Sequence, residues 1–357
     1  MKVGIVGCGV ISKHYAENAP AFDAFELVAC ADLDRAFAEA LAGDHGLEVL
    51  GVDELIADPA IDILLNLTPP AAHLDVTRAA LAAGKHVYTE KPLATQGDDA
   101  AELVAEAAGL GLELGCAPDI FLGGAYQAAR TLIDEGAIGE PVAVSAAMLV
   151  GGADAWHPSP EQFFQDGAGP LLDMGPYYLT AIVALLGPIS RVAGFASTLT
   201  PERSIAVGPR SGGRFVPTTP THVSTAMELA SGATANLVAS FEATDRYVCD
   251  LEIHGREGVL ALPDPNSFEG PLRIRRNRGE WQEAPYASRG AREARGIGLN
   301  DLAEAVAEGR APRASGALGS HVVEVARSVL AAAAEGRAIE ISSRAERPEP
   351  LPVLRLA

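Results

Sequence analysis

A glycine-rich turn between an apolar run and a helical segment constrains this chain more than any other feature. The turn, Gly7-Cys8-Gly9-Val10-Ile11-Ser12, follows the apolar residues 2–6 and opens a helical pattern over residues 10–19. Its first glycine permits a tight turn, its second lets the backbone approach a pyrophosphate, and the small Ser12 can replace a third glycine where helix and strand pack. In this context the turn predicts a dinucleotide site formed by Gly7, Gly9, Val10 and Ile11, although a glycine turn without a ligand is the alternative.

Short apolar runs and helical segments alternate over the first 116 residues. Further strands are predicted at residues 26–31, 61–67, 86–88 and 112–116, and helices at residues 71–83 and 98–108. Strands that alternate with helices of 10–15 residues indicate βαβ units. The N-terminal part is therefore predicted to be an α/β fold with a doubly wound parallel sheet.

Strand-like runs dominate after about residue 120. They cover residues 141–149, 189–198, 221–229, 233–241, 247–254 and 257–262, and helices are predicted at 124–135, 174–186, 299–308 and 319–335. The runs on either side of residues 230–232 predict a hairpin, and residues 200–220 and 263–271 are predicted to be loops. The chain is thus divided into a nucleotide-binding domain of residues 1–119 and a second α/β domain of residues 120–357 with an open, mostly antiparallel sheet.

The charge of the chain limits its partners. The 27 Lys and Arg residues against 47 Asp and Glu residues give a formal net charge of −20, which argues against nucleic acid and anionic membranes. A bound dinucleotide remains compatible, because backbone N–H groups hold its phosphates. No apolar run approaches the ~20 residues of a membrane span and no signal peptide is recognisable, so a cytoplasmic protein is expected. The four cysteines have no metal-ligand spacing, and no metal is expected.

Two segments at strand ends are predicted to border the cofactor. Asp32 ends the second apolar run, where a carboxylate would accept hydrogen bonds from the adenosine ribose and repel a 2′-phosphate, which favours NAD over NADP. Arg35 could instead pair with a 2′-phosphate, and Asp32 could instead be an ordinary turn or capping residue. The third strong strand ends in Asn66, Thr68, Pro69 and, a little further on, His73. These residues are expected near the cofactor, although His73 fits equally well as a first-turn helix residue that packs on the loop.

A third segment carries candidates for proton transfer. Glu90-Lys91-Pro92 follows a strand, and a lysine beside a nicotinamide could orient a substrate hydroxyl and stabilise an alkoxide. A solvated cation before a rigid turn is the alternative. Asp173 and Tyr177 are four residues apart at an apolar helix start, so they are predicted to share a helical face. Opposite Lys91 they would make a proton-transfer set, whereas in isolation they fit a helix-start acid and a packed aromatic residue.

These motifs together resemble the glucose-fructose oxidoreductase, inositol dehydrogenase and rhizopine-catabolism (Gfo/Idh/MocA) family over nearly the whole chain. The resemblance is carried by the Gly7–Ser12 turn, Ala31-Asp32, the Thr68-Pro69 segment with His73, residues 84–94 and residues 169–177. It implies a Rossmann domain followed by an α/β domain with an open antiparallel sheet. It also implies that Lys91 and Asp173 belong to the active site, that Glu90 and Lys91 lie beside the cofactor, and that the Lys91–Pro92 peptide is cis.

The chain departs from many members of this family at one position. They carry His four residues after the motif Asp as general acid/base, whereas this chain has Tyr177. Glucose-fructose oxidoreductase and the dimeric dihydrodiol dehydrogenases are similar to it in having Tyr there. A tyrosine can serve if a neighbouring cation stabilises its phenolate. Tyr178 is the alternative if the helix register differs by one residue.

The sequence therefore predicts an NAD(P)-dependent oxidoreductase that moves a hydride between nicotinamide and a secondary hydroxyl or ketone of a sugar, cyclitol or related polyol. Lys91, Asp173 and Tyr177 are the expected catalytic and substrate-binding residues. Trp156, His157 and Asp119 are expected to line the substrate cleft, with Arg295 as a weaker candidate, although Trp156 and His157 fit equally well as a packed aromatic residue and a solvated imidazole. An NAD-dependent glycosidase and a non-catalytic NAD-binding regulator are the alternatives. The open sheet predicts a homodimer or homotetramer.

Overall fold

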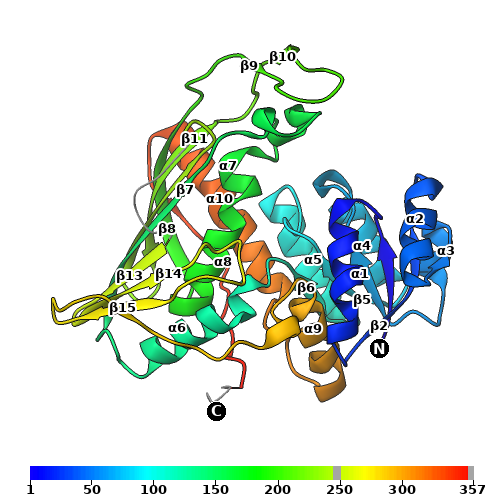
Figure 1. The fold of residues 1–357 in the computed structure, drawn as a ribbon, viewed down its shortest axis with the longest axis horizontal. Helices are drawn as coiled ribbons and strands as arrows, with labels where there is room; N and C mark the ends of the chain where they lie inside the picture. Colours follow the sequence, from blue (N-terminus) through cyan, green and yellow to red (C-terminus); the bar gives the residue numbers. More distant parts are fainter. Residues whose placement is uncertain (244–250, 353–357) are drawn as a thin grey trace.

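A parallel sheet organises the N-terminal part of the protein. The computed structural model describes residues 1–243 and 251–352, and Figure 1 shows this sheet with helices on both of its faces. Its strand order is β3-β2-β1-β4-β5-β6, and every pairing is parallel. The strands are β1 (Lys2–Val6), β2 (Glu26–Ala31), β3 (Glu48–Val49), β4 (Ile63–Asn66), β5 (His86–Thr89) and β6 (Leu114–Cys116). The doubly wound parallel sheet is confirmed.

The helices of this part follow their strands directly. They are α1 (Val10–Asn18), α2 (Arg35–His45), α3 (Val52–Ala57), α4 (His73–Ala82) and α5 (Gly97–Leu110). The chain runs outward from β1 to β3 and then crosses to β4 on the other side of β1. Ligands of such sheets bind at this reversal, beyond the carboxyl ends of the strands. The turns after β1 and β4 therefore mark the expected cofactor crevice.

A larger sheet forms the C-terminal part. Its order is β16-β15-β14-β13-β7-β12-β11-β8-β17, and among the described strands only the β12–β7 pair is parallel. The strands are β7 (Pro141–Leu149), β8 (Ile189–Ser197), β11 (His222–Leu229), β12 (Thr234–Ser240), β13 (Leu251–Gly255), β14 (Gly258–Leu262), β15 (Arg273–Arg276), β16 (Gln282–Glu283) and β17 (Ile339–Glu340). The mostly antiparallel sheet and the β11–β12 hairpin are confirmed. The first four residues of the predicted strand 247–254 lie outside the described residues.

Residues 200–220 were predicted to be a loop, but they contain two short strands. β9 (Arg203–Ser204) pairs with β10 (Arg214–Phe215) in a small separate sheet. The carboxylates of Asp154 and Glu242 lie 3.1 Å and 3.2 Å from the guanidinium of Arg203, which also stacks on Phe164. These contacts hold the two short strands beside the end of β7, at the top of Figure 1.

Helices cover one face of the large sheet, between it and the parallel sheet (Figure 1). They are α6 (Gly124–Asp134), α8 (Gly175–Leu186) and α10 (Gly316–Glu335), while α9 (Ile297–Glu308) contacts β6. α8 is buried along all but its last residue, as expected for a helix that is apolar all round. α10 is long and apolar enough to cross a membrane by composition, but it packs against β8, α8 and, in the parallel domain, α5 and β6. It is a core helix shared by both parts.

Candidate active site

The turn after β1 is shaped to receive a dinucleotide. Gly7 has φ of +99°, and a Cβ there would lie 2.6 Å from the carbonyl group of Leu67, so only glycine allows this turn to pack against the turn after β4. A Cβ on Gly9 would meet nothing within 4 Å, so the space in front of this residue is open. Gly9 also caps α1 without a side-chain hydrogen bond. Helix N–H groups beside an open space are a site for a pyrophosphate.

The remaining residues of this turn fit the same purpose. Val10 is 81% exposed and Ile11 is half-buried at the start of α1, where a cofactor would cover them. Ser12 is fully buried, and its hydroxyl donates a 2.7 Å hydrogen bond to the carbonyl oxygen of Gly9. A third glycine is therefore unnecessary, because the serine side chain turns back onto its own helix start. Phosphates would meet backbone groups here, which agrees with the acidic composition of the chain.

Asp32 stands beside this turn at the end of β2. Its Oδ2 accepts a 2.7 Å hydrogen bond from the backbone N–H of Cys8, and its Oδ1 accepts one from Asp34. Carboxylate oxygens have further lone pairs, so the half-buried Asp32 can also accept from ribose hydroxyls. Arg35 is directed along α2, where it pairs with Glu39 at 2.8 Å. The carboxylate, and not the arginine, therefore adjoins the turn.

Asn66, Thr68 and His73 shape the turn after β4, which packs against the Gly7 turn. Asn66 is fully buried, and its Oδ1 accepts hydrogen bonds from the N–H and the hydroxyl of Thr68, which fixes the turn after β4. His73 is also buried, and its ring nitrogens lie 2.8 Å from the carbonyl oxygen of Thr68 and 2.6 Å from that of Pro92. Burial lowers the pKa of this imidazole. His73 thus ties two loops together, as its packing alternative foresaw, and leaves Thr68 and the exposed Pro69 to face the crevice.

Lys91, Asp173 and Tyr177 come together from three different elements. The ammonium of Lys91 donates to the backbone oxygen of Asp173 at 2.6 Å and to its carboxylate at 2.8 Å. It also lies 5.3 Å from the ring centre of Tyr177. Burial disfavours the charged form of Lys91, but Asp173, Tyr177 and Glu90 more than offset this and raise its pKa above the ordinary value. The Lys91–Pro92 peptide is cis, as the resemblance implies.

One local expectation is corrected here, because Asp173 and Tyr177 do not share one continuous helix. α7 (Gly169–Asp173) ends before α8 begins at Gly175, and Met174 lies between them. Pro176 causes the break, since it has no N–H to donate to the carbonyl group four residues earlier. The break leaves the carboxylate of Asp173 on Lys91 and the ring of Tyr177 beside it. Tyr178, the alternative, is 1% exposed in the apolar core.

Arg295, which lies just before α9, contacts both Tyr177 and Glu90. Its Nη2 donates to the phenol oxygen of Tyr177 at 3.2 Å, and its Nη1 lies 3.9 Å from Oε1 of Glu90. Glu90 in turn accepts from the hydroxyl of Tyr15 at 3.0 Å and from the N–H of Lys91 at 3.1 Å. Glu90 is only 8% exposed, so it acts from behind the site and not as an open cofactor contact. The glycines near Arg295 were the only sequence signal for this residue.

Asp119 was expected to line the substrate cleft, but the structure places it behind the site. It is fully buried, and its Oδ2 accepts from the N–H groups of Gly296 at 3.4 Å and Gly298 at 3.0 Å. Burial raises the pKa of this carboxyl group, while the Gly298 hydrogen bond and Arg295 act in the opposite direction. Asp119 therefore anchors the segment that carries Arg295.

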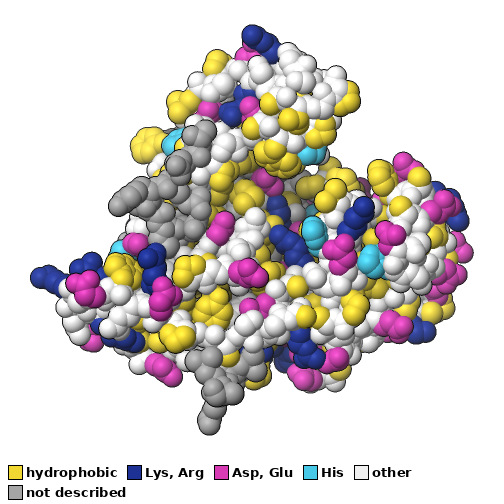
Figure 2. Space-filling model, viewed as in Figure 1, with side chains coloured by type: hydrophobic (Ala, Val, Ile, Leu, Met, Phe, Trp, Pro, Cys, Tyr) yellow, Lys and Arg dark blue, Asp and Glu magenta, His cyan; other side chains and the backbone are white. Residues whose placement is uncertain are grey.

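Trp156 and His157 lie in the loop between β7 and α7. Trp156 is 61% exposed, and its ring packs edge-on against His157 at 5.5 Å and tilted against Phe163 at 5.7 Å. Phe163 ends the short helix η5 (Pro160–Phe163), which contacts α7. The loop is thereby attached to the helix that ends at Asp173. Figure 2 shows a hollow between the lobe that carries this loop and the nucleotide domain, with basic and acidic side chains within it.

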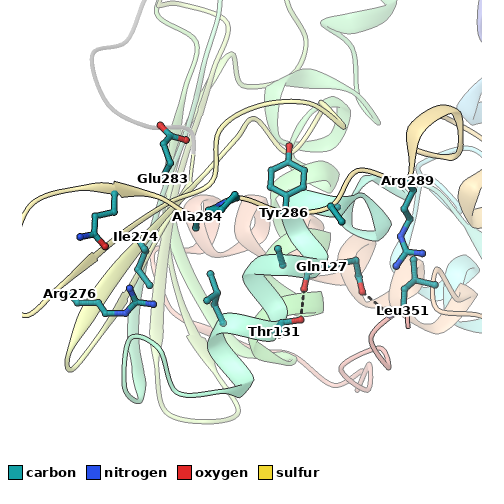
Figure 3. A pocket seen from close by; sticks show the side chains of 15 residues that line it. Gln127, Thr131, Ile274, Arg276, Glu283, Ala284, Tyr286, Arg289 and Leu351 are labelled. Carbon is teal, nitrogen blue, oxygen red and sulfur yellow. Dashed lines mark hydrogen bonds between the residues drawn. The ribbon is translucent and has the colours of Figure 1, made fainter. Parts of the chain in front are cut away.

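A cavity of about 430 Å³ lies away from the residues described above, between α6 and the segment around β15 and β16 (Figure 3). None of the predicted site residues lines it. Its Gln127 accepts from the N–H of Leu351, and the hydroxyl of Thr131 donates to the backbone oxygen of Gln127. Among residues 1–243 and 251–352, no group of three or more His, Cys, Asp and Glu side chains could hold a metal ion.

Comparisons with known proteins agree with this geometry. Residues 1–116 match the oxidoreductase family with an NAD-binding Rossmann fold, and residues 126–261 match the GFO/IDH/MocA C-terminal domain. A 1,5-anhydro-D-fructose reductase of Ensifer adhaerens is 28% identical over 351 residues, which cover 95% of this chain and 98% of the relative. A dTDP-3,4-didehydro-2,6-dideoxy-alpha-D-glucose 3-reductase of Streptomyces violaceoruber is 31% identical over 288 residues, or 78% of each chain.

A solved structure shares the fold over almost the whole length. The apo form of levoglucosan dehydrogenase matches 97% of this chain and 99% of its own, with a TM-score of 0.83 and 24% identity. The parallel sheet with its glycine turn and the mostly antiparallel second sheet follow the pattern that the sequence predicted. The chain belongs to the GFO/IDH/MocA family of oxidoreductases with an NAD-binding Rossmann fold.

Proposed function

We propose that this enzyme is an NAD-dependent dehydrogenase or reductase that acts on a secondary hydroxyl or ketone of an uncharged sugar or cyclitol. The observation that carries the proposal is the ammonium of Lys91. Two of its hydrogen bonds go to Asp173, at 2.6 and 2.8 Å. An ammonium has three donors, so one remains for a substrate oxygen. This donor is held beside the phenol of Tyr177 and next to the nucleotide crevice.

Each side chain has a distinct part in this proposal. When bound, the nicotinamide would accept or supply the hydride. In the oxidative direction, the phenolate of Tyr177 accepts the proton of the substrate hydroxyl, directly or through a relay. Lys91 orients that hydroxyl and stabilises negative charge as it develops on the substrate oxygen. Asp173 fixes the ammonium in place, and in the reductive direction Tyr177 returns the proton.

The balance of charge around the site favours an uncharged substrate. The two cations, Lys91 and Arg295, each lie beside a carboxylate, that of Asp173 at 2.8 Å and that of Glu90 at 3.9 Å. No surplus of positive charge is therefore left at these four residues for a carboxylate or phosphate of the substrate. The exposed ring of Trp156 offers an apolar surface on which a sugar ring could stack, with His157 beside it as a hydrogen-bonding partner. The Ensifer adhaerens relative is named for 1,5-anhydro-D-fructose, an uncharged sugar derivative, whereas the Streptomyces violaceoruber relative is named for a dTDP-linked sugar, whose phosphates are charged.

The preference for NAD over NADP rests on Asp32. This carboxylate is tied to the glycine turn through Cys8, so it is fixed where the ribose of the cofactor would lie. A 2′-phosphate would meet its negative charge, and Arg35 is occupied by Glu39. We therefore propose that NAD is the working cofactor.

The uncovered face of the large sheet supports a homodimer or homotetramer. Figure 1 shows α6, α8 and α10 on the other face only. On this face, Phe195 of β8 is 85% exposed and Ala226 of β11 is exposed. A second copy would bury this surface. Light scattering after gel filtration tests this, and a Phe195→Glu variant is expected to shift the mass toward the monomer.

The experiment that tests the function is NAD reduction by the purified protein across neutral sugars, inositols and sugar acids, with NADP in parallel. Turnover of a neutral polyol with NAD is the expected result. Turnover of sugar acids alone would contradict the charge argument. Tight NAD binding without any turnover would reject the dehydrogenase, whereas cleavage of a glycoside without net NADH would indicate a glycosidase.

A further inference from the structure

Two cations, and not one, flank the Tyr177 ring. Lys91 comes from the loop after β5 and lies 5.3 Å from the ring centre. The guanidinium carbon of Arg295, just before α9, lies 5.8 Å from the same centre. Arg295 also donates directly to the phenol oxygen at 3.2 Å, while both hydrogen bonds of the Lys91 ammonium go to Asp173. Arg295 is thus the cation in contact with the oxygen that gains and loses the proton.

The position of Arg295 is fixed by contacts along its length. Its Nη2 also donates to Oδ1 of Asn266 at 3.2 Å, and Nη1 lies 3.9 Å from Glu90. Its backbone oxygen accepts from Nδ2 of Asn18 at 3.2 Å. Burial disfavours its charge, but Tyr177, Glu90 and Asp119 more than offset this and raise the pKa of the guanidinium above its ordinary value. Arg295 therefore keeps its positive charge in the folded protein.

The backbone that follows Arg295 is equally constrained. Gly296 has φ of +112°, a conformation that favours glycine, and its N–H donates to Asp119. A Cβ on Gly298 would lie 2.2 Å from the hydroxyl of Tyr88 and 2.7 Å from Cβ of Asp119. The chain can pass this close to two fully buried side chains only because residue 298 is glycine. The backbone next to Arg295 is thus held in one conformation.

We propose that Arg295 is a positioning residue that orients the phenol of Tyr177 and favours its deprotonated form. This inference rests on the proposed function, in which Tyr177 exchanges the substrate proton. A hydrogen bond from a charged donor is stronger to a phenolate than to a phenol. The charged groups that bear on Tyr177 are Lys91 and Arg295 directly, with Asp173 and Glu90 as their respective partners.

The sign of the pH dependence follows from this arrangement. In the oxidative direction of the proposed reaction the phenolate is the active form, so the rate is expected to rise with pH. Loss of Arg295 removes a charge-assisted hydrogen bond that favours the phenolate, so this rise is expected at higher pH in the variant. At neutral pH, kcat falls about 10- to 100-fold, and much of the loss is recovered in alkaline buffer.

The experiment compares kcat and KM against pH for the wild type and for Arg295→Met, Arg295→Lys and Arg292→Gln. Arg292→Gln is the matched control, because this exposed arginine lies three residues earlier and pairs with Asp23. The proposal expects a displaced profile with Arg295→Met, partial restoration with Arg295→Lys and no change with the control. A uniform loss at every pH would indicate a purely structural role and overturn the proposal, as would an unchanged profile. Thermal melting identifies any variant that fails to fold.

A second measurement does not depend on turnover. The ultraviolet absorbance of ionised tyrosine is followed against pH in the wild type, in Tyr177→Phe and in Arg295→Met. The difference between the wild type and Tyr177→Phe isolates the ionisation of this one residue among the seven tyrosines. Its transition is expected to move to higher pH in Arg295→Met. An unmoved transition refutes the inference about Arg295, whereas a wild type that ionises as expected but turns over no substrate refutes only the proposed function.

Discussion

Replacement of Lys91 by Met removes the ammonium of the site and keeps the apolar stem of the side chain. At an effective dielectric constant of about 20, a cation 5.3 Å from the Tyr177 ring stabilises a unit negative charge there by about 3 kcal/mol. The third ammonium donor adds about 1.5–3 kcal/mol when it bonds to a developing alkoxide. The two effects together predict a fall in kcat/KM of about 10³- to 10⁴-fold.

The assay is NADH formation with the best substrate of the panel, together with calorimetric titration of NAD. NAD affinity is expected to change by less than about threefold, because we propose that the phosphates bind at the Gly7–Ser12 turn and not at Lys91. Lys2→Met is the matched control, since Lys2 lies at the exposed start of β1. A Lys91→Met enzyme within tenfold of the wild type, with unchanged NAD binding, would refute the role given to the ammonium.

Three further predictions test other parts of the site. Tyr177→Phe is expected to lower kcat about 10²- to 10⁴-fold, as for loss of a general base, whereas Tyr178→Phe should retain most activity in the same steady-state assay. Asp32→Ala is expected to weaken NAD binding and to lower the ratio of kcat/KM with NAD to kcat/KM with NADP about tenfold or more. An unchanged ratio would show that Asp32 does not contact the cofactor. Gly298→Ala is expected to destabilise the protein by about 1–3 kcal/mol, because the new methyl group meets Tyr88; a chemical denaturation curve like that of the wild type would contradict this.

The N-terminal domain could be predicted well because its turns carry specific residue types. β2 spans residues 26–31 as predicted, and the Gly7 turn packs where only a glycine fits. By contrast, no element was predicted between residues 33 and 60, although α2, α3 and β3 lie there. α3 has six residues and β3 has two, which is too short for a periodic pattern. The two-residue strands β9 and β10 were missed for the same reason.

Some residues of the candidate site could be predicted from sequence motifs and others could not. Lys91, Asp173 and Tyr177 could be proposed because a motif marks each of them, whereas the placement of Asp119 was wrong and Arg295 was only a weaker candidate. Residue type alone could not show that Asp119 is fully buried beneath the Gly296–Gly298 backbone. The contact between Arg295 and Tyr177 spans 118 positions of sequence, so no local pattern reports it. Such contacts depend on how α9 packs against β6, which is a property of the folded chain.

The candidate active site is assembled from residues of both domains. The nucleotide turn and Lys91 belong to the parallel domain, Asp173 and Tyr177 belong to α7 and α8, and Arg295 precedes α9. α10 then packs against α5 and β6, and Ser315 bridges back to Gly115 at the edge of the parallel sheet. The residues proposed for the cofactor site therefore all lie in the first domain, whereas the residues proposed for proton transfer meet only when the C-terminal helices are docked. A substitution that weakens the packing of α10 on α5 and β6 is therefore expected to lower turnover more than NAD affinity, because only the proton-transfer residues depend on that packing.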